Sequence, residues 1–142
     1  MIALGCDHGG FELMQDVIKY LESQNIEYKN YGTYSNESCD YPVFAKSVAN
    51  AVVSGECEQG ILICGTGIGI SIAANKIKGI RAALCGDCFS AKATREHNNA
   101  NILAMGARVT GPGLAIEIVK AFLGTDFSND ERHIRRINQI ED

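Results

Sequence analysis

The feature that most constrains the fold of this chain is an apolar run that ends in a cysteine and is followed at once by glycines. Residues 60–64 read Gly-Ile-Leu-Ile-Cys, residues 65–69 read Gly-Thr-Gly-Ile-Gly, and a helical pattern runs from Ile68 to Lys76. Such a segment is typical of a buried strand that turns tightly into a helix. It places Cys64 at the carboxyl end of a strand, beside backbone N–H groups that can stabilise a negative charge formed during a reaction.

Strands and helices alternate along the whole chain. Apolar runs predict strands over residues 2–6, 27–31, 60–64, 81–85 and 102–105. Apolar residues at helical spacing predict the intervening helices over residues 14–21, 42–54, 68–76, 89–96 and 112–122. This order predicts an α/β fold, a three-layer α/β/α sandwich around a five-stranded parallel sheet. With 142 residues and no visible linker or repeat, residues 1–142 are predicted to form a single domain.

An extra C-terminal helix is predicted from about Asn129 to Ile140. Its apolar residues Ile134, Ile137 and Ile140 alternate with three arginines. Docking of this helix on a second subunit would bury the isoleucines, so we expect a homodimer. The alternative is a helix that lies on its own domain, and the sequence does not separate the two.

Composition limits the partners and the compartment. The formal net charge of −4 disfavours nucleic acid as a partner of the whole surface. The N-terminus shows no basic segment followed by an apolar one, and no apolar run approaches the length of a membrane span, so neither secretion nor a membrane is expected. The six cysteines are then best interpreted as reduced thiols of a cytoplasmic protein.

Polar and glycine residues gather where the predicted strands end. The segments are Cys6-Asp7-His8-Gly9-Gly10, Cys64-Gly65-Thr66-Gly67 and Cys85-Gly86-Asp87. Ligands of open parallel sheets bind beyond the carboxyl ends of the strands. These three turns are therefore the predicted site.

Several patterns allow more than one interpretation. Gly65-Thr66-Gly67-Ile68-Gly69 is G-x-G-x-G rather than the dinucleotide pattern G-x-G-x-x-G, although Asp87 follows at about the distance of a ribose-binding acid. Cys64 could be a small buried apolar residue, but a helix start favours a thiolate, and we favour a functional role. Cys85 and Cys88 form a lone C-x-x-C, for which a redox role is a minor option.

Histidines and arginines supply proton carriers and anion ligands. His8 and His97 fall in loops near the expected crevice, and either could move protons near neutral pH. Without a facing cluster of carboxylates, the histidines do not predict a metal site. Arg132 and Arg136 lie one helical turn apart and could clamp a phosphate, but spacing alone favours solvated surface charges, for them and for Arg108. This inventory fits acid–base chemistry on a small phosphorylated carbonyl compound.

Long stretches of the chain resemble ribose-5-phosphate isomerase type B. The matching segments cover essentially the whole chain in order: residues 7–10 (DHGG), 36–38 (NES), 40–42 (DYP), 54–57 (SGEC), 63–74 (ICGTGIGISIAA), 75–76 (NK), 79–83 (GIRAA) and 95–98 (REHN). The resemblance implies a Rossmann-like α/β/α sandwich and an aldose–ketose isomerase that interconverts ribose 5-phosphate and ribulose 5-phosphate without metal or cofactor. It also implies a homodimer, in some members a tetramer, with sites shared between subunits.

The resemblance assigns roles to individual residues. Cys64 would be the base that moves the proton between C2 and C1, Thr66 would help to move the proton between O1 and O2, and the backbone at Gly65, Gly67 and Gly69 would hold the enediolate oxygen. His97 would open the furanose ring, with Asp7 and Asn98 at ring or hydroxyl oxygens. The phosphate ligands implied by the family are His8, Arg108, Arg132 and Arg136. In the family, His97 and Arg108 reach the site from the neighbouring subunit.

The chain departs from the family at two positions. One branch has a glutamate base where this chain has Ile70, which leaves Cys64 as the only candidate base in the loop. Asn99 stands where aspartate is common, which bears on fine hydrogen bonding and not on the reaction class. Galactose-6-phosphate isomerase subunits, allose 6-phosphate as a substrate, a non-catalytic sugar-phosphate or nucleotide-binding module, and a thiol redox protein stay as alternatives.

Overall fold

The computed structural model describes all residues, 1–142, and confirms the predicted fold class. The strands are β1 (Ile2–Cys6), β2 (Tyr28–Asn30), β3 (Gln59–Cys64), β4 (Ala82–Leu84) and β5 (Ile102–Gly106). The helices are α1 (Phe11–Ser23), α2 (Tyr41–Val53), α3 (Ile68–Ala74), α4 (Cys88–Asn98), α5 (Pro112–Leu123) and α6 (Glu131–Glu141), with a short 3-10 turn, η1, at His8–Gly10. All strand pairs are parallel, in the order β2-β1-β3-β5-β4.

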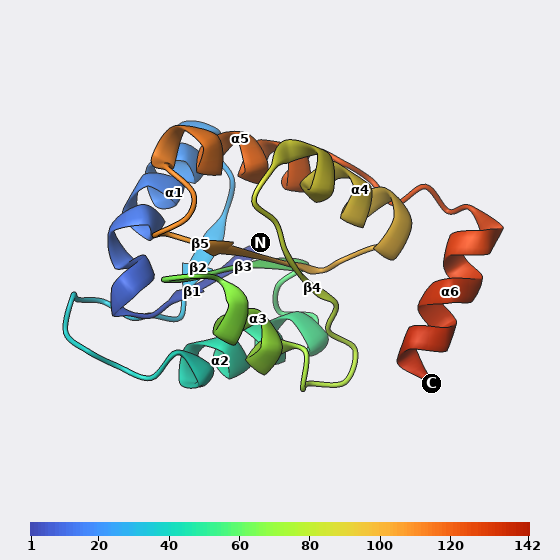
Figure 1. Cartoon of the computed structure of the whole chain (residues 1–142), viewed down its shortest axis with the longest axis horizontal. Helices are drawn as coiled ribbons and strands as arrows, with labels where there is room; N and C mark the ends of the chain where they lie inside the picture. Colours follow the sequence, from blue (N-terminus) through green and yellow to red (C-terminus); the bar gives the residue numbers. More distant parts are fainter.

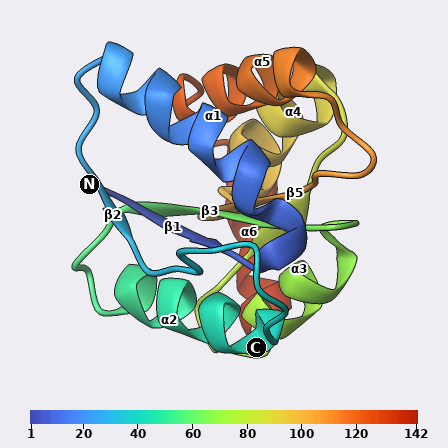
Figure 2. The same cartoon turned by 90° about the vertical axis from the view of Figure 1, so that its left-hand side faces the viewer.

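The sheet lies between two layers of helices. Helices α1, α4 and α5 cover one face and α2 and α3 cover the other (Figures 1 and 2). Successive residues of β3 serve opposite layers, because strand side chains alternate. Ile61 and Ile63 pack with α1 and α5, whereas Leu62 and Cys64 face α2 and α3. The Cys64 side chain therefore points to the layer formed by α2 and α3.

The order of the strands determines where a ligand can bind. The chain leaves β1 toward the edge strand β2 and then returns to β3 on the other side of β1, so the direction of winding changes between β1 and β3. A crevice forms at such a switch point, outside the carboxyl ends of the strands. Cys6 of β1 is paired with Ile63, and Cys64 is paired with Gly106 of β5. Three neighbouring strands therefore end at one level, next to the predicted site.

Gly67 is required by the turn that joins β3 to α3. Its φ is 78°, and a Cβ there would lie 2.5 Å from Leu84 Cδ1 and 2.7 Å from the carbonyl carbon of Met105. Both the left-handed backbone and the contact with fixed backbone penalise any larger residue.

We expect Gly67→Ala to lower the free energy of unfolding by about 2 kcal/mol or more, measured by urea denaturation. Gly113→Ala is the matched control: it lies in the first turn of α5, and a Cβ there would meet nothing within 4 Å. That variant should be neutral or stabilised by up to about 1 kcal/mol. Equal stability of the two variants would contradict the role given to Gly67.

Helix α6 projects from the body of the molecule (Figure 1). Its buried residue is His133, while Ile134 and Ile140 are 40% and 61% exposed. The helix is only partly covered by its own chain, so docking of its exposed isoleucines on a second subunit stays a prediction. None of the helices combines the length and the apolar character that crossing a bilayer requires.

Candidate active site

The Cys64 thiol is held in the turn after β3. The backbone N–H of Gly67 donates a hydrogen bond to Cys64 Sγ over 3.1 Å, and the residue is 5% exposed. The Cys64 carbonyl accepts from the N–H of Ala107, which ties the turn to the end of β5. An N–H aimed at sulfur stabilises the thiolate, so the geometry suits a base or a nucleophile.

Two side chains lie at the start of α3, the helix that follows the Cys64 turn. Thr66 is exposed, and its Oγ1 accepts a hydrogen bond from the Ile68 N–H over 3.1 Å. A Cβ at Gly69 would lie 2.6 Å from Tyr41 Cζ, so the Tyr41 ring rests on the first turn of α3. The Tyr41 side chain therefore packs on the helix that follows the Cys64 turn.

The loop after β1 lies against the loop after β3. A Cβ at Gly9 would be 3.3 Å from the Gly65 nitrogen, so the two backbones are in near contact. Asp7 is buried, and its Oδ1 caps η1 by accepting from the Gly10 N–H over 3.1 Å. His8 Nδ1 accepts from the Cys39 N–H over 3.2 Å, which leaves Nε2 as the donor of the neutral ring.

Arg108 brings a positive charge to the same loop. The backbone N–H of Arg108 donates to the Gly65 carbonyl over 2.9 Å, and the side-chain Nη1 would lie 3.3 Å from a Cβ built at Gly65. It makes no ion pair, and with Gly9, Glu12 and Thr110 it lines a cavity of about 240 Å³. The expectation that Arg108 comes from a neighbouring subunit is corrected by this contact, because the side chain lies on its own Gly65.

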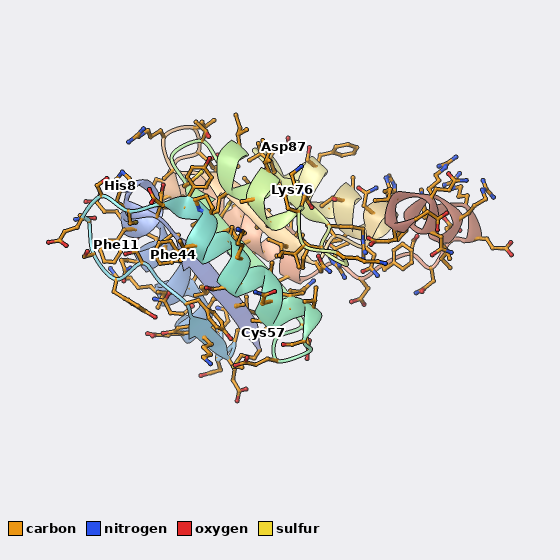
Figure 3. All side chains as sticks on the ribbon, turned by 90° about the horizontal axis from the view of Figure 1, so that it is seen from below. His8, Phe11, Phe44, Cys57, Lys76 and Asp87 are labelled. Carbon is orange, nitrogen blue, oxygen red and sulfur yellow. The ribbon has the colours of Figure 1, made fainter.

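The remaining predicted site residues lie at the other end of the sheet. His97 and Asn98 end α4 just before β5, and the Asn98 carbonyl accepts from Arg81 Nε at the start of β4. Ile102 lies four residue steps before Gly106, the partner of Cys64, which amounts to about 13 Å along β5. Arg132 and Arg136 lie beyond that end, on α6. Figure 3 shows His8 and α6 at opposite ends of the molecule.

The predicted site is therefore split within one chain. One group, the thiol loop group, contains Cys64, Gly65, Thr66, Gly67, Gly69, Asp7, His8 and Arg108. The other, the α4–α6 group, contains His97, Asn98, Arg132 and Arg136. The interpretation that His8 and His97 both border one crevice is wrong for a single chain, because α4 starts at the carboxyl edge of the sheet and carries His97 back to the amino edge.

Sequence reasoning missed His133. Its ring stacks on His97, with centroids 4.5 Å apart and planes inclined by 20°. A signal for this existed, since His133 and Ile137 lie one helical turn apart on one side of α6, and both are less exposed than Ile134 and Ile140. Burial, the neighbouring His97 and Arg132 all lower the pKa of His133.

The structure disfavours two of the alternatives. Asp87 caps α4, with Oδ1 accepting from the Ser90 N–H over 2.6 Å, and these hydrogen bonds lower the pKa of its carboxyl. The Asp87 carboxylate is thus occupied by hydrogen bonds to Ser90, whereas a ribose-binding acid needs its oxygens free for the ribose hydroxyls. Burial raises the pKa of the Cys85 thiol to about 11, which makes a C-x-x-C redox couple with Cys88 a poor one.

No three His, Cys, Asp or Glu side chains converge as a metal ion would need.

Comparison with known proteins places this geometry in context. A family model described as Ribose/Galactose Isomerase matches residues 2–140. The chain is 55% identical over 142 residues to the putative sugar phosphate isomerase YwlF of Bacillus subtilis, covering 99% of this chain and 95% of that protein. It is 50% identical over 139 residues to ribose-5-phosphate isomerase B of Escherichia coli, covering 98% and 93%. A solved structure of Clostridium thermocellum ribose-5-phosphate isomerase B superposes with a TM-score of 0.97 at 51% identity, covering 99% and 94%.

Proposed function

Because the chain belongs to the Ribose/Galactose Isomerase family and is a sugar-phosphate isomerase, we propose that it interconverts ribose 5-phosphate and ribulose 5-phosphate. The observation that carries the proposal is the Cys64 sulfur, set at a switch-point crevice and receiving the Gly67 N–H. Full-length relatives with the printed name ribose-5-phosphate isomerase B support the choice of substrate.

The proposed chemistry starts from the open-chain aldehyde. The Cys64 thiolate takes the proton from C2, and the electron pair forms the C1–C2 double bond while O1 becomes an oxyanion held by N–H groups of residues 65–69. The Thr66 hydroxyl passes the O2 proton to O1. Cys64 then returns its proton to C1, the C2 carbonyl forms, and the thiolate is regenerated. Atoms and charge balance without a cofactor.

The α4–α6 group supplies the steps before the proton transfer. Ribose 5-phosphate is a furanose in solution, so a proton must reach the ring oxygen and another must leave the C1 hydroxyl. We assign that exchange to His97, with Asp7 and Asn98 hydrogen-bonded to ring or hydroxyl oxygens. The phosphate would be held by His8 Nε2 and by the guanidinium groups of Arg108, Arg132 and Arg136.

A homodimer, alone or within a tetramer, would complete the site. Within one chain the thiol loop group and the α4–α6 group lie at opposite ends of the sheet, so His97 can meet Cys64 only from a second copy. Apolar side chains are exposed around the thiol loop, on α3, β4 and α4, and include Ile68, Ile72, Leu84 and Phe89. Burying these side chains would drive such an association.

Shared sites predict complementation between two inactive variants. In a dimer of Cys64→Ala with His97→Asn, one site combines the intact Cys64 of one chain with the intact His97 of the other. Random reassociation of equal amounts makes half of the dimers mixed, each with one complete site, so about a quarter of the wild-type activity should return. Each variant refolded alone is the control. Failure of the mixture to exceed the separate variants, while mixed dimers form, would contradict shared sites.

The substrate assignment is tested with a panel of sugar phosphates. Purified protein treated with EDTA should convert ribose 5-phosphate with a kcat/KM at least about tenfold above that for galactose 6-phosphate or allose 6-phosphate. Isothermal titration with ribose 5-phosphate runs in parallel. Binding without turnover would indicate a non-catalytic module, and a preference for a hexose phosphate would overturn the pentose assignment.

A further inference from the structure

His133 is a buried titratable residue that the proposed chemistry leaves without a role. It is 7% exposed in a helix that is otherwise mostly solvated. The face of its ring covers the face of the exposed His97 ring at a centroid separation of 4.5 Å. A flat partner at that distance restricts the rotation of an otherwise mobile surface histidine.

The two rings lie at helix ends of opposite polarity. His97 is in the last turn of α4, at the negative end of the helix dipole. His133 is in the first turn of α6, where the positive end disfavours an imidazolium. The charged groups around the pair are Arg95 and Glu96 on α4, with Lys92 paired to Glu96, and Asp130, Glu131, Arg132 and Arg136 at α6. Burial and the positive charges nearby lower the pKa of His133, which favours its neutral form.

The stacked histidine pair is not the only contact that holds α6 against the rest of the chain. At its far end Glu141 Oε1 accepts from Arg81 Nη1 over 2.7 Å, in a partly buried ion pair. Before its first residue, the Ser128 N–H donates to the Glu96 carbonyl over 3.3 Å. The helix is thus attached at both ends without His133, so a buried histidine stacked on the proposed ring-opening residue does more than anchor α6.

We propose that His133 is a positioning residue for His97, holding the imidazole by stacking in the orientation from which it protonates the ring oxygen of a furanose phosphate. The inference rests on the proposed function, in which His97 opens the ring. Stacking requires a flat ring and not a second titrating group. Phenylalanine at position 133 should therefore substitute for histidine, whereas leucine, of similar volume but without a ring, should not.

The test compares two reactions of the same enzyme. Net conversion of ribose 5-phosphate needs ring opening. Exchange of deuterium from D₂O into C1 of ribulose 5-phosphate does not, because its O5 is esterified and the ketose stays open. His133→Leu should lower net kcat by about tenfold or more while exchange changes by less than about threefold. His133→Phe should restore net conversion to within about threefold of wild type, and Asn138→Ala, on exposed α6 surface, should resemble wild type.

Each other result overturns the inference. An unchanged His133→Leu enzyme shows that His97 needs no stacking partner. Equal losses in both reactions show that His133 only docks α6 and its arginines. Selective loss in both the Leu and the Phe variants shows that the imidazole nitrogens are required. His97→Asn distinguishes failure of the proposed function from failure of this inference. If His97→Asn leaves net conversion unchanged, His97 does not open the ring. If His97→Asn lowers only net conversion and the His133 variants have no effect, only the positioning role of His133 is wrong.

Discussion

Replacement of Cys64 by alanine is expected to lower kcat for ribose 5-phosphate by about 10⁴-fold, the largest effect of any single substitution in this chain. The thiol loop contains no other side chain able to accept a carbon-bound proton. Ile70 is apolar and fully buried, and Thr66 is a hydroxyl without an adjacent base. Deuterium exchange into C1 of ribulose 5-phosphate should disappear together with net conversion, because both need the same proton transfer.

The fold should survive this substitution. Alanine removes one sulfur atom and one accepted hydrogen bond from a turn whose shape is determined by backbone contacts, including the Ala107 N–H to the Cys64 carbonyl. Circular dichroism and the urea midpoint check this. Cys88→Ala, in the first turn of α4, is the matched thiol control and should keep kcat within about twofold. Turnover by Cys64→Ala within tenfold of wild type would show that the base lies elsewhere.

The central strands were predictable because their sequences are continuous apolar runs between glycine or polar turns. β1 has the predicted bounds, β3 starts one residue earlier and β5 ends one residue later. The edge strands β2 and β4 are shorter than predicted, since each is paired on one side only. Helix α3 ends at Ala74 rather than Lys76, because the Asn75 amide bonds both the N–H and the carbonyl of Ala82. That competition between side chain and helix cannot be detected from hydrophobic spacing.

The thiol loop group was also predictable, for a topological reason. Parallel strands bring their carboxyl ends to one edge, so residues that follow β1, β3 and β5 must meet. A helix that follows a parallel strand runs back to the amino edge of the sheet, and His97 lies at such a helix end. The polar sequence around His97 does not by itself indicate that edge. The stacking of His133 on His97 depends on the path of residues 124–130 and on the angle of α6, which no local pattern determines.

Replacement of His97 by asparagine is expected to separate ring opening from isomerisation. Asparagine keeps a polar planar group at the end of α4 but cannot exchange a proton near neutral pH. Net conversion of ribose 5-phosphate should fall by about 100-fold, the lower range for loss of a general acid–base group. Deuterium exchange into ribulose 5-phosphate should stay within about threefold of wild type, since Cys64 and the thiol loop are untouched.

A four-carbon aldose phosphate provides an independent check of the same step. Erythrose 4-phosphate carries its phosphate on O4 and cannot close a furanose, so its kcat/KM should be nearly equal for wild type and His97→Asn. Glu96→Gln, the neighbouring residue on α4, is the control for general disturbance of that helix end. If His97→Asn lowers turnover of the open and the closed substrates alike, His97 binds the sugar rather than opening its ring. A selective loss would instead show that His97 acts in ring opening, a step separate from the proton transfer at Cys64.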